Sequence, residues 1–263
     1  MVIICILFSI TAVSANDNQT DALNQDLISD NGLSISDNDE LTETVKSYDD
    51  FYEDIKDCTD TFDIDGNYVY TEGDNKTYLG VKQSNLVING NNHVIDGSGS
   101  AHAFSFSKGK QNITINDLTF VNCNQSIMLE SGTLILNNVN FTGNFNSRSD
   151  AGIVTVMSKG DLILNNCTFN SNVNSSLIMA GNAEVTINNS HFYNTHAGWD
   201  APILVNRKSL VIENSTFENL SSKYGGAINF KGDYLSVKNS TFRNSYAYMT
   251  GGAIVARYFA ITI

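Results

Sequence analysis

Two stretches, "LVIENSTFENLS" at residues 210–221 and "LSVKNSTFRNSY" at residues 235–246, are nearly the same sequence twenty-five residues apart. Four more copies precede them: "ITINDLTF" (113–120), "LILNNVNF" (134–141), "LILNNCTF" (162–169) and "VTINNSHF" (185–192). Aligned on their last residue, the copies place a phenylalanine at Phe120, Phe141, Phe169, Phe192, Phe217 and Phe242, at spacings of 21, 28, 23, 25 and 25 residues. A period of this length is typical of a solenoid, in which each repeat buries its apolar face against its neighbours.

Within a repeat, apolar residues alternate with polar ones, which is the pattern of a β-strand. Leu210 and Ile212 form one short strand, Asn214 turns a corner, and Ser215 and Phe217 form a second. A third strand follows in "GGAINF" (225–230), "GGAIVA" (251–256), "AGIVTV" (151–156) and "APILVN" (201–206). Three strands per repeat predict an all-β fold, a right-handed parallel β-helix of about seven coils.

In such a stack each residue lies about 4.8 Å from its counterpart in the next coil, so the side chains at equivalent positions must pack well against one another. We expect the six phenylalanine rings to stack on one another. The corner positions are Asp117, Asn138, Asn166, Asn189, Asn214 and Asn239. Asparagine tolerates the left-handed backbone of a bend, and its amide both donates and accepts, so we also expect a side-chain ladder at this column.

The start of the chain differs from the repeats. Residues 1–15, "MVIICILFSITAVSA", have the apolar run and the small residues of a secretory signal peptide, although no Lys or Arg precedes the run. Residues 16–46 have few large apolar residues and predict a disordered acidic leader. Of the net charge of −13, residues 16–60 account for −12, since they hold fourteen acidic residues and two lysines. No basic patch is left to bind nucleic acid.

Residues 47–85 are expected to form an N-terminal cap and the first strands. "SYDDFYEDIKD" (47–57) has a capping Ser47, an acid three residues later at Asp50, and Phe51 and Ile55 on one face, which predicts a short amphipathic helix. This helix would cover the open end of the solenoid, or would simply belong to the leader. Residues 86–263 hold the β-helix repeats, and the final "ITI" begins another copy without finishing it, so we expect the chain to be a fragment.

The repeats contain few residues suited to catalysis. Asp150 and Asp200 share a register about two coils apart, but solvated loop acids explain them equally well. His191 and His196 lie five residues apart near Asp200, yet His191 falls in an outward column, so we predict neither a metal site nor a cofactor. The thiols of Cys58 and Cys123 remain possible partners in a disulfide, and Cys167 fills a small inward position.

Aromatic residues on the variable loops are the feature of the sequence that indicates a binding surface. Trp199 and Tyr224 each lie seven residues after a repeat phenylalanine, and Tyr246 and Tyr248 follow in the next loop. Stacked coils would bring these side chains to one edge, where flat rings suit sugars or a protein partner. The alternative is that they fasten the loops to the solenoid.

The signal-like start, the acidic leader, the helix, "LVINGNNHVIDG" (86–97) and the "NSTF" coils with "YGGAI" and "TGGAI" together resemble the adhesin-like β-helix surface proteins of methanogenic archaea, in the pectin-lyase-like group of folds. The resemblance implies a secreted, non-enzymatic surface protein whose partners are host or microbial surface glycans or proteins. Attachment to a membrane or cell wall would depend on a missing C-terminal part. Two alternatives stay open: a polysaccharide lyase or glycoside hydrolase on the same fold, and a passive cell-wall spacer.

Overall fold

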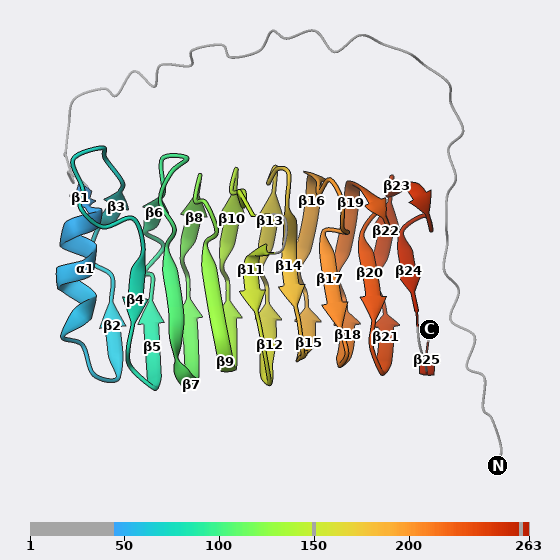
Figure 1. Ribbon diagram of the computed structural model, residues 1–263, viewed down its shortest axis with the longest axis horizontal. Coiled ribbons are helices and arrows are strands. Elements are labelled where there is room, and N and C mark those ends of the chain that lie inside the picture. Colours follow the sequence, from blue (N-terminus) through green and yellow to red (C-terminus); the bar gives the residue numbers. More distant parts are fainter. Residues whose placement is uncertain (1–44, 149–150, 258–259, 263) are drawn as a thin grey trace, which may run out of the picture.

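The computed structural model describes residues 45–148, 151–257 and 260–262. The predicted signal peptide and all but the last two residues of the predicted leader lie outside them. The described chain is a parallel β-solenoid of about eight turns, so the predicted fold class is confirmed. In Figure 1 the turns follow one another along the long axis of the molecule in the order of the sequence.

Each turn contains three strands, which form three rows along the solenoid. The first row consists of β2 (Thr61–Asp63), β5 (Asn85–Asn89), β7 (Phe104–Asn116), β9 (Ile127–Asn137), β12 (Gly160–Asn165), β15 (Ala183–Asn188), β18 (Ser209–Glu213), β21 (Tyr234–Lys238) and β25 (Ala260–Thr262). The second, here called the phenylalanine row, consists of β1 (Val45–Ser47), β3 (Asn67–Val69), β6 (Val94–Asp96), β8 (Thr119–Val121), β10 (Asn140–Thr142), β13 (Thr168–Asn170), β16 (His191–His196), β19 (Thr216–Tyr224), β22 (Thr241–Arg243) and β23 (Tyr246–Thr250). The third consists of β4 (Leu79–Val81), β11 (Gly152–Val156), β14 (Ser176–Ala180), β17 (Ile203–Asn206), β20 (Ile228–Lys231) and β24 (Ile254–Ala256), together with the first halves of β7 and β9.

The structure has one turn more than the sequence predicted. The strands β2, β3 and β4, within residues 61–81, already form a complete turn that pairs in parallel with the next one. This segment lacks the repeated "NSTF" signature, and the sequence predicted it only as part of the cap and the first strands. Residues 45 and 46, predicted as the end of the leader, belong to β1, which pairs with β3.

The core is a column of side chains from all three rows. Phe120, Phe141, Phe169, Phe192 and Phe217 are fully buried, and Phe242 is partly buried. Successive rings in this column lie 4.4–5.1 Å apart between centroids and within 11° of parallel. In-register parallel pairing, such as Phe141 opposite Phe169, imposes this arrangement because it holds like residues at strand spacing.

The corner before each phenylalanine is formed by left-handed backbone. The φ angles of Asp117, Asn138, Asn166, Asn189, Asn214 and Asn239 lie between 48° and 54°. Asparagine adopts this conformation with less strain than most residues, which accounts for its recurrence at the bend.

The continuous side-chain ladder lies one residue earlier than predicted. At the ends of the first-row strands each amide nitrogen donates to the amide oxygen of the preceding turn, and the donors are Asn116, Asn137, Asn165 and Asn188, at 2.8–3.1 Å. In the described corner column only the Asn138 amide makes such a bond, to Asp117 at 2.9 Å. Strand pairing holds these asparagines in register with their counterparts. A second ladder joins the left-handed residues Asn194, Asn219 and Asn244, with both bonds at 3.0 Å.

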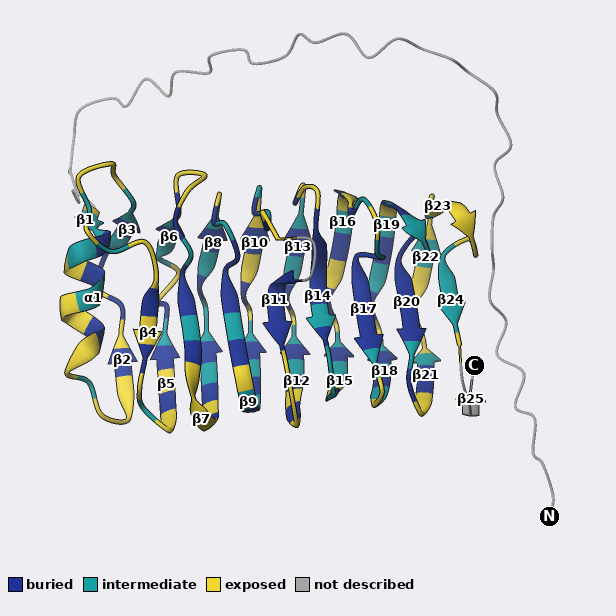
Figure 2. Ribbon diagram, in the orientation of Figure 1, coloured by how far each residue is buried: buried dark blue, intermediate teal, exposed yellow. Residues whose placement is uncertain are grey.

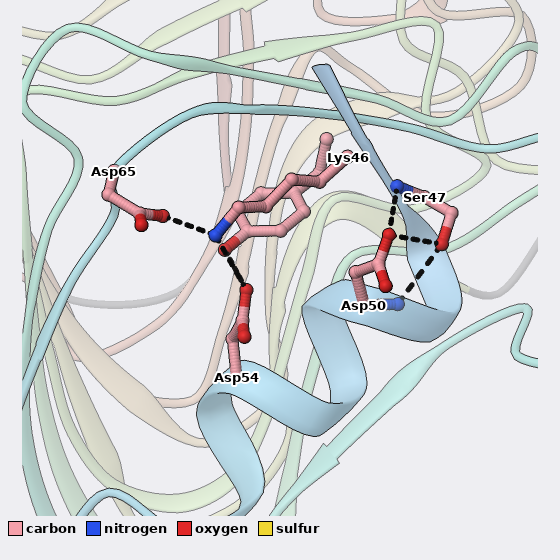
Figure 3. Close-up of polar contacts among 6 residues, drawn as sticks. Lys46, Ser47, Asp50, Asp54 and Asp65 are labelled. Atoms are coloured by element: carbon pink, nitrogen blue, oxygen red, sulfur yellow. Dashed lines mark hydrogen bonds and ion pairs between the residues drawn. The ribbon is translucent and has the colours of Figure 1, made fainter. Parts of the chain in front are cut away.

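The predicted helix is present as α1 (Tyr48–Lys56), and it stands against the first turn at one end of the solenoid (Figure 1). Its N-terminus is the capping box drawn in Figure 3: the Asp50 N–H donates to the Ser47 hydroxyl at 3.1 Å, and the Ser47 N–H donates to the Asp50 carboxylate at 3.0 Å. Tyr48, Phe51 and Ile55 form its buried face, with the Phe51 ring stacked 4.3 Å from that of Tyr68. The helix therefore covers the apolar end of the core.

An ion-pair network ties this cap to the first turn. The Lys46 ammonium lies 3.0 Å from an Asp54 carboxylate oxygen on the helix and 2.6 Å from one of Asp65 in the loop after β2 (Figure 3). The Tyr68 hydroxyl also donates to Asp54, at 2.8 Å. Hydrogen bonds to these carboxylates raise the pKa of Lys46, with that to Asp65 making the largest contribution.

Candidate functional site: an aromatic groove at a β-bulge

An open, shallow groove of about 340 Å³ lies at the end of the solenoid away from α1. Its lining consists of Gly198, Trp199, Lys223, Tyr248 and Met249, and these five residues are here called the aromatic groove. They come from the loop after β16 and from the strands β19 and β23. Figure 2 shows β23 as an exposed strand, in contrast to the largely buried β14, β17 and β20 of the third row.

The backbone of β19 fixes the Trp199 loop. The Ala197 N–H donates to the Ser221 carbonyl, and the Lys223 N–H donates to the Gly198 carbonyl, both at 2.8 Å. Gly198 has φ +72°, a conformation that side chains rarely adopt. On the other side of the loop, the Asn229 amide donates to Asp200 at 3.4 Å. Trp199 is thus held on a short, tied turn, with 68% of its surface exposed.

A β-bulge places Tyr248 and Met249 opposite Lys223. Ser222 pairs with Ala247 and Tyr224 pairs with Thr250, so the two residues between them on β23 face the single residue Lys223 on β19. Bulges locally redirect side chains and are common at sheet edges and beside functional sites. This irregularity is what brings the two exposed side chains of β23 to the groove.

The orientation of Tyr248 is set from two sides. Its ring meets the His196 ring edge to face at 5.7 Å and the Tyr246 ring at 5.1 Å. The Tyr248 hydroxyl lies 3.5 Å from Nδ1 of His196, which also forms a 2.9 Å hydrogen bond with the Ser221 hydroxyl. Tyr248 is nevertheless 55% exposed. An exposed ring whose neighbours restrain it loses little conformational freedom when it binds a partner.

Lys223 gives the groove its charge. Its ammonium lies 3.4 Å from the centroid of the Trp199 ring and 5.5 Å from that of Tyr224. Acidic side chains near the groove are engaged elsewhere, with Glu218 paired to Arg243 at 3.7 Å. In the part of the chain that the structure describes, no carboxylate forms an ion pair with Lys223.

Of the four aromatic residues singled out from the sequence, Trp199 and Tyr248 line the groove, and Tyr246 packs against Tyr248. Tyr224 is half-buried and lies beyond Lys223. Sequence reasoning missed Lys223 and Met249, because neither stands out within a repeat. It weighed His196 only as a metal ligand beside His191 and Asp200, whereas the structure places its exposed ring against Tyr248.

The other candidates do not assemble into a site. Asp150 lies outside the described residues. The His191 ring meets Tyr193 at 5.7 Å, away from the groove. Across residues 45–148, 151–257 and 260–262, no three His, Cys, Asp or Glu side chains are grouped so as to hold a metal ion.

The thiols that were considered for a disulfide are free in the structure. The Cys58 thiol donates to the Ile55 carbonyl at 3.0 Å, and the Cys123 thiol to the Val121 carbonyl at 3.4 Å. Burial raises the pKa of Cys123 and that of Cys167 to about 12, so neither is suited to act as a nucleophile at neutral pH.

A second hollow, of about 310 Å³, lies on the outward face of β5, β7 and β9. It is formed by side chains such as Val87, Thr114 and Ile135, with Asp60 at its margin. These residues repeat along the row with the strands, so the hollow is a consequence of the regular sheet surface. The aromatic groove differs because it depends on a loop, a bulge and a cation that interrupt the repeat.

Comparisons of the chain with protein-family models, with curated proteins and with solved structures found no match. Within the described residues, no helix has the length and apolar character needed to cross a membrane.

Proposed function

We propose that this chain is a secreted, non-enzymatic surface protein that presents the aromatic groove on a rigid β-solenoid for binding glycans or surface proteins. The observation that carries the proposal is the 68% exposure of Trp199, which lies between described turns and shares one groove with the restrained Tyr248 ring. Large exposed rings on an otherwise polar surface are typical of recognition sites, since they contribute contact area at little cost in conformational entropy.

The remaining support comes from the sequence. The signal-like residues 1–15 favour export, and the coils resemble those of the adhesin-like surface proteins of methanogenic archaea. A stack of parallel turns with a buried core is a stiff support that keeps loops at a fixed position. Adhesion is accordingly the role that we propose, with the groove as the contact surface.

The test is a binding screen against immobilised surface polysaccharides and surface-protein fragments, in which Trp199→Ala is compared with the wild type. Tyr78→Ala is the matched control, because Tyr78 is 58% exposed but lies just before β4, far along the chain from the groove. We expect Trp199→Ala to weaken binding about tenfold or more, as loss of a central aromatic contact does, and Tyr78→Ala to leave it unchanged.

The same samples are assayed for new reducing ends and unsaturated products. Release of either from a polysaccharide would identify an enzyme and refute the non-enzymatic proposal. Equal loss of binding in both variants would show that the groove is not the contact surface.

A further inference from the structure

We infer that the aromatic groove binds an acidic peptide segment of a protein partner, with a carboxylate of the segment on Lys223 and an adjacent apolar side chain over Trp199, Tyr248 and Met249. This inference rests on the proposed function and specifies the ligand of the same site. It follows from three properties of the lining: an unmatched charge, a particular set of apolar residues, and a shortage of hydrogen-bonding groups.

The first property is the charge of Lys223. The side chain is half-buried and its ammonium is 3.4 Å from the centre of the Trp199 ring, so part of its hydration shell is replaced by an aromatic face. Two cations of the next turn have acidic partners: Arg243 with Glu218 at 3.7 Å, and Lys238 with Glu213 at 3.6 Å. Lys223 has none among the described residues, so an incoming carboxylate would complete the site.

The second property is the choice of apolar residues. Trp, Tyr and Met are enriched at the centres of protein interfaces, where a few aromatic anchors carry most of the binding energy. Met249 is 61% exposed beside Trp199 and Tyr248, and a flexible thioether at such a place adapts to different apolar side chains. Trp199 stays 68% exposed although Lys223 covers one face, so the rest of its ring is open to a ligand.

The third property separates a peptide from a sugar. A saccharide presents several hydroxyl groups, each of which needs a donor or an acceptor. The groove contains no side-chain amide or carboxylate, and the Tyr248 hydroxyl lies within 3.5 Å of His196. A peptide that brings one carboxylate and one apolar group matches what the groove offers, whereas the hydroxyls of a saccharide would stay hydrated in this open groove and find few side chains that fix its orientation.

The experiment is a selection from a randomised nonapeptide display library on the whole 263-residue protein, in parallel on the wild type, Lys223→Gln, Lys223→Arg and Lys208→Gln. Lys208 is an exposed lysine between β17 and β18, so its substitution removes the same charge at another place. Circular dichroism and the unfolding midpoint show that each variant is folded. Oligosaccharides with and without carboxylates are tested for binding to the same samples.

We expect the wild type, Lys223→Arg and Lys208→Gln to select peptides with Asp or Glu beside a large apolar residue. Lys223→Gln should lose the acidic preference and bind the selected wild-type peptides roughly tenfold more weakly, about 1.4 kcal/mol. Selected peptides without acids, or an acidic preference that survives in Lys223→Gln, would overturn the inference.

Two further outcomes separate the inference from the proposed function. If no peptide is selected but carboxylated oligosaccharides bind and Trp199→Ala abolishes that binding, the inference is wrong and the proposed function stands. If neither peptides nor oligosaccharides bind, and surface-protein fragments do not bind either, both are wrong.

Discussion

Truncating a central ring of the phenylalanine column should unfold the protein more readily than truncating its last described ring. Phe169 is fully buried, and its ring lies 4.4 Å from that of Phe141 and 4.8 Å from that of Phe192. Burial of a phenylalanine is worth about 2 kcal/mol, and each aromatic pair about 1 kcal/mol more. Phe169→Ala should therefore lower the free energy of unfolding by about 4 kcal/mol, within the range found for such substitutions in tightly packed cores.

Phe242→Ala is the matched control, because it is the same substitution in the same column. Phe242 is only partly buried and has one partner in the column, Phe217, at 4.5 Å. Its loss should cost about 2 kcal/mol on the same reasoning. Phe169→Leu, which refills most of the volume, should also cost less than Phe169→Ala.

The assay is thermal unfolding followed by circular dichroism, supported by hydrogen exchange. A loss of about 4 kcal/mol should lower the melting temperature by about 8–16 °C in a chain of this size. Turns contact only their neighbours, so protection should fall first in the turns that contain Phe141 and Phe192. A change within about 1 kcal/mol of the wild type, or equal costs for Phe169→Ala and Phe242→Ala, would refute the account of the column.

Three other predictions concern the cap, the ladder and the thiols. Ser47→Ala should cost about 1 kcal/mol at neutral pH by chemical denaturation. Hydrogen bonds from the Ser47 N–H and hydroxyl hold the pKa of Asp50 below its ordinary value of 3.8. Their contribution to the free energy of unfolding is therefore present above pH 3.8 and lost as the pH falls further. If the destabilisation caused by Ser47→Ala did not shrink in acid, this account would be contradicted. Asn165→Asp should lower the free energy of unfolding by about 1–3 kcal/mol at pH 7, because an ionised carboxylate cannot donate to the Asn137 amide oxygen. The loss should be smaller in acid, where the protonated carboxyl group can donate again. Chemical denaturation at both pH values measures the difference. In the native protein a thiol reagent should modify the partly exposed Cys58 before the buried Cys123, and equal rates would show that the core opens freely.

The repeated part of the fold is predictable from the sequence because each turn must pair with and pack against the turns next to it. A parallel register places equivalent residues of successive turns side by side, so residue types that stack well recur at the same position of each repeat. Examples are the phenylalanine at position 169, which pairs with Phe192, and the left-handed asparagine at position 166. The first turn, within residues 61–81, lacks this repetition because one of its faces packs on α1 and not on another turn. The sequence therefore predicts strands in this segment without the register that makes them a turn.

The ladder was misplaced by one residue for a related reason. Both Asn165 and Asn166 recur in the repeats, and the sequence alone does not say which of two adjacent asparagines keeps its amide in register. In the structure the side-chain amide of Asn165 bonds to those of its strand partners Asn137 and Asn188. A distinction of this kind depends on backbone geometry that two neighbouring residues of the same type do not reveal.

The aromatic groove lies where the repeat is irregular. In the sequence this irregularity is a spacing between two motifs that is one residue longer than the spacing between the phenylalanines. The phenylalanines Phe217 and Phe242 are 25 residues apart, but the glycines that open "GGAI", Gly225 and Gly251, are 26 apart. The extra residue is accommodated by the bulge between β19 and β23, which places two residues opposite Lys223. A regular turn has no such freedom, because every side chain must stack on its counterpart. In this solenoid the change of spacing between the two "GGAI" motifs therefore coincides with the bulge that forms one side of the aromatic groove.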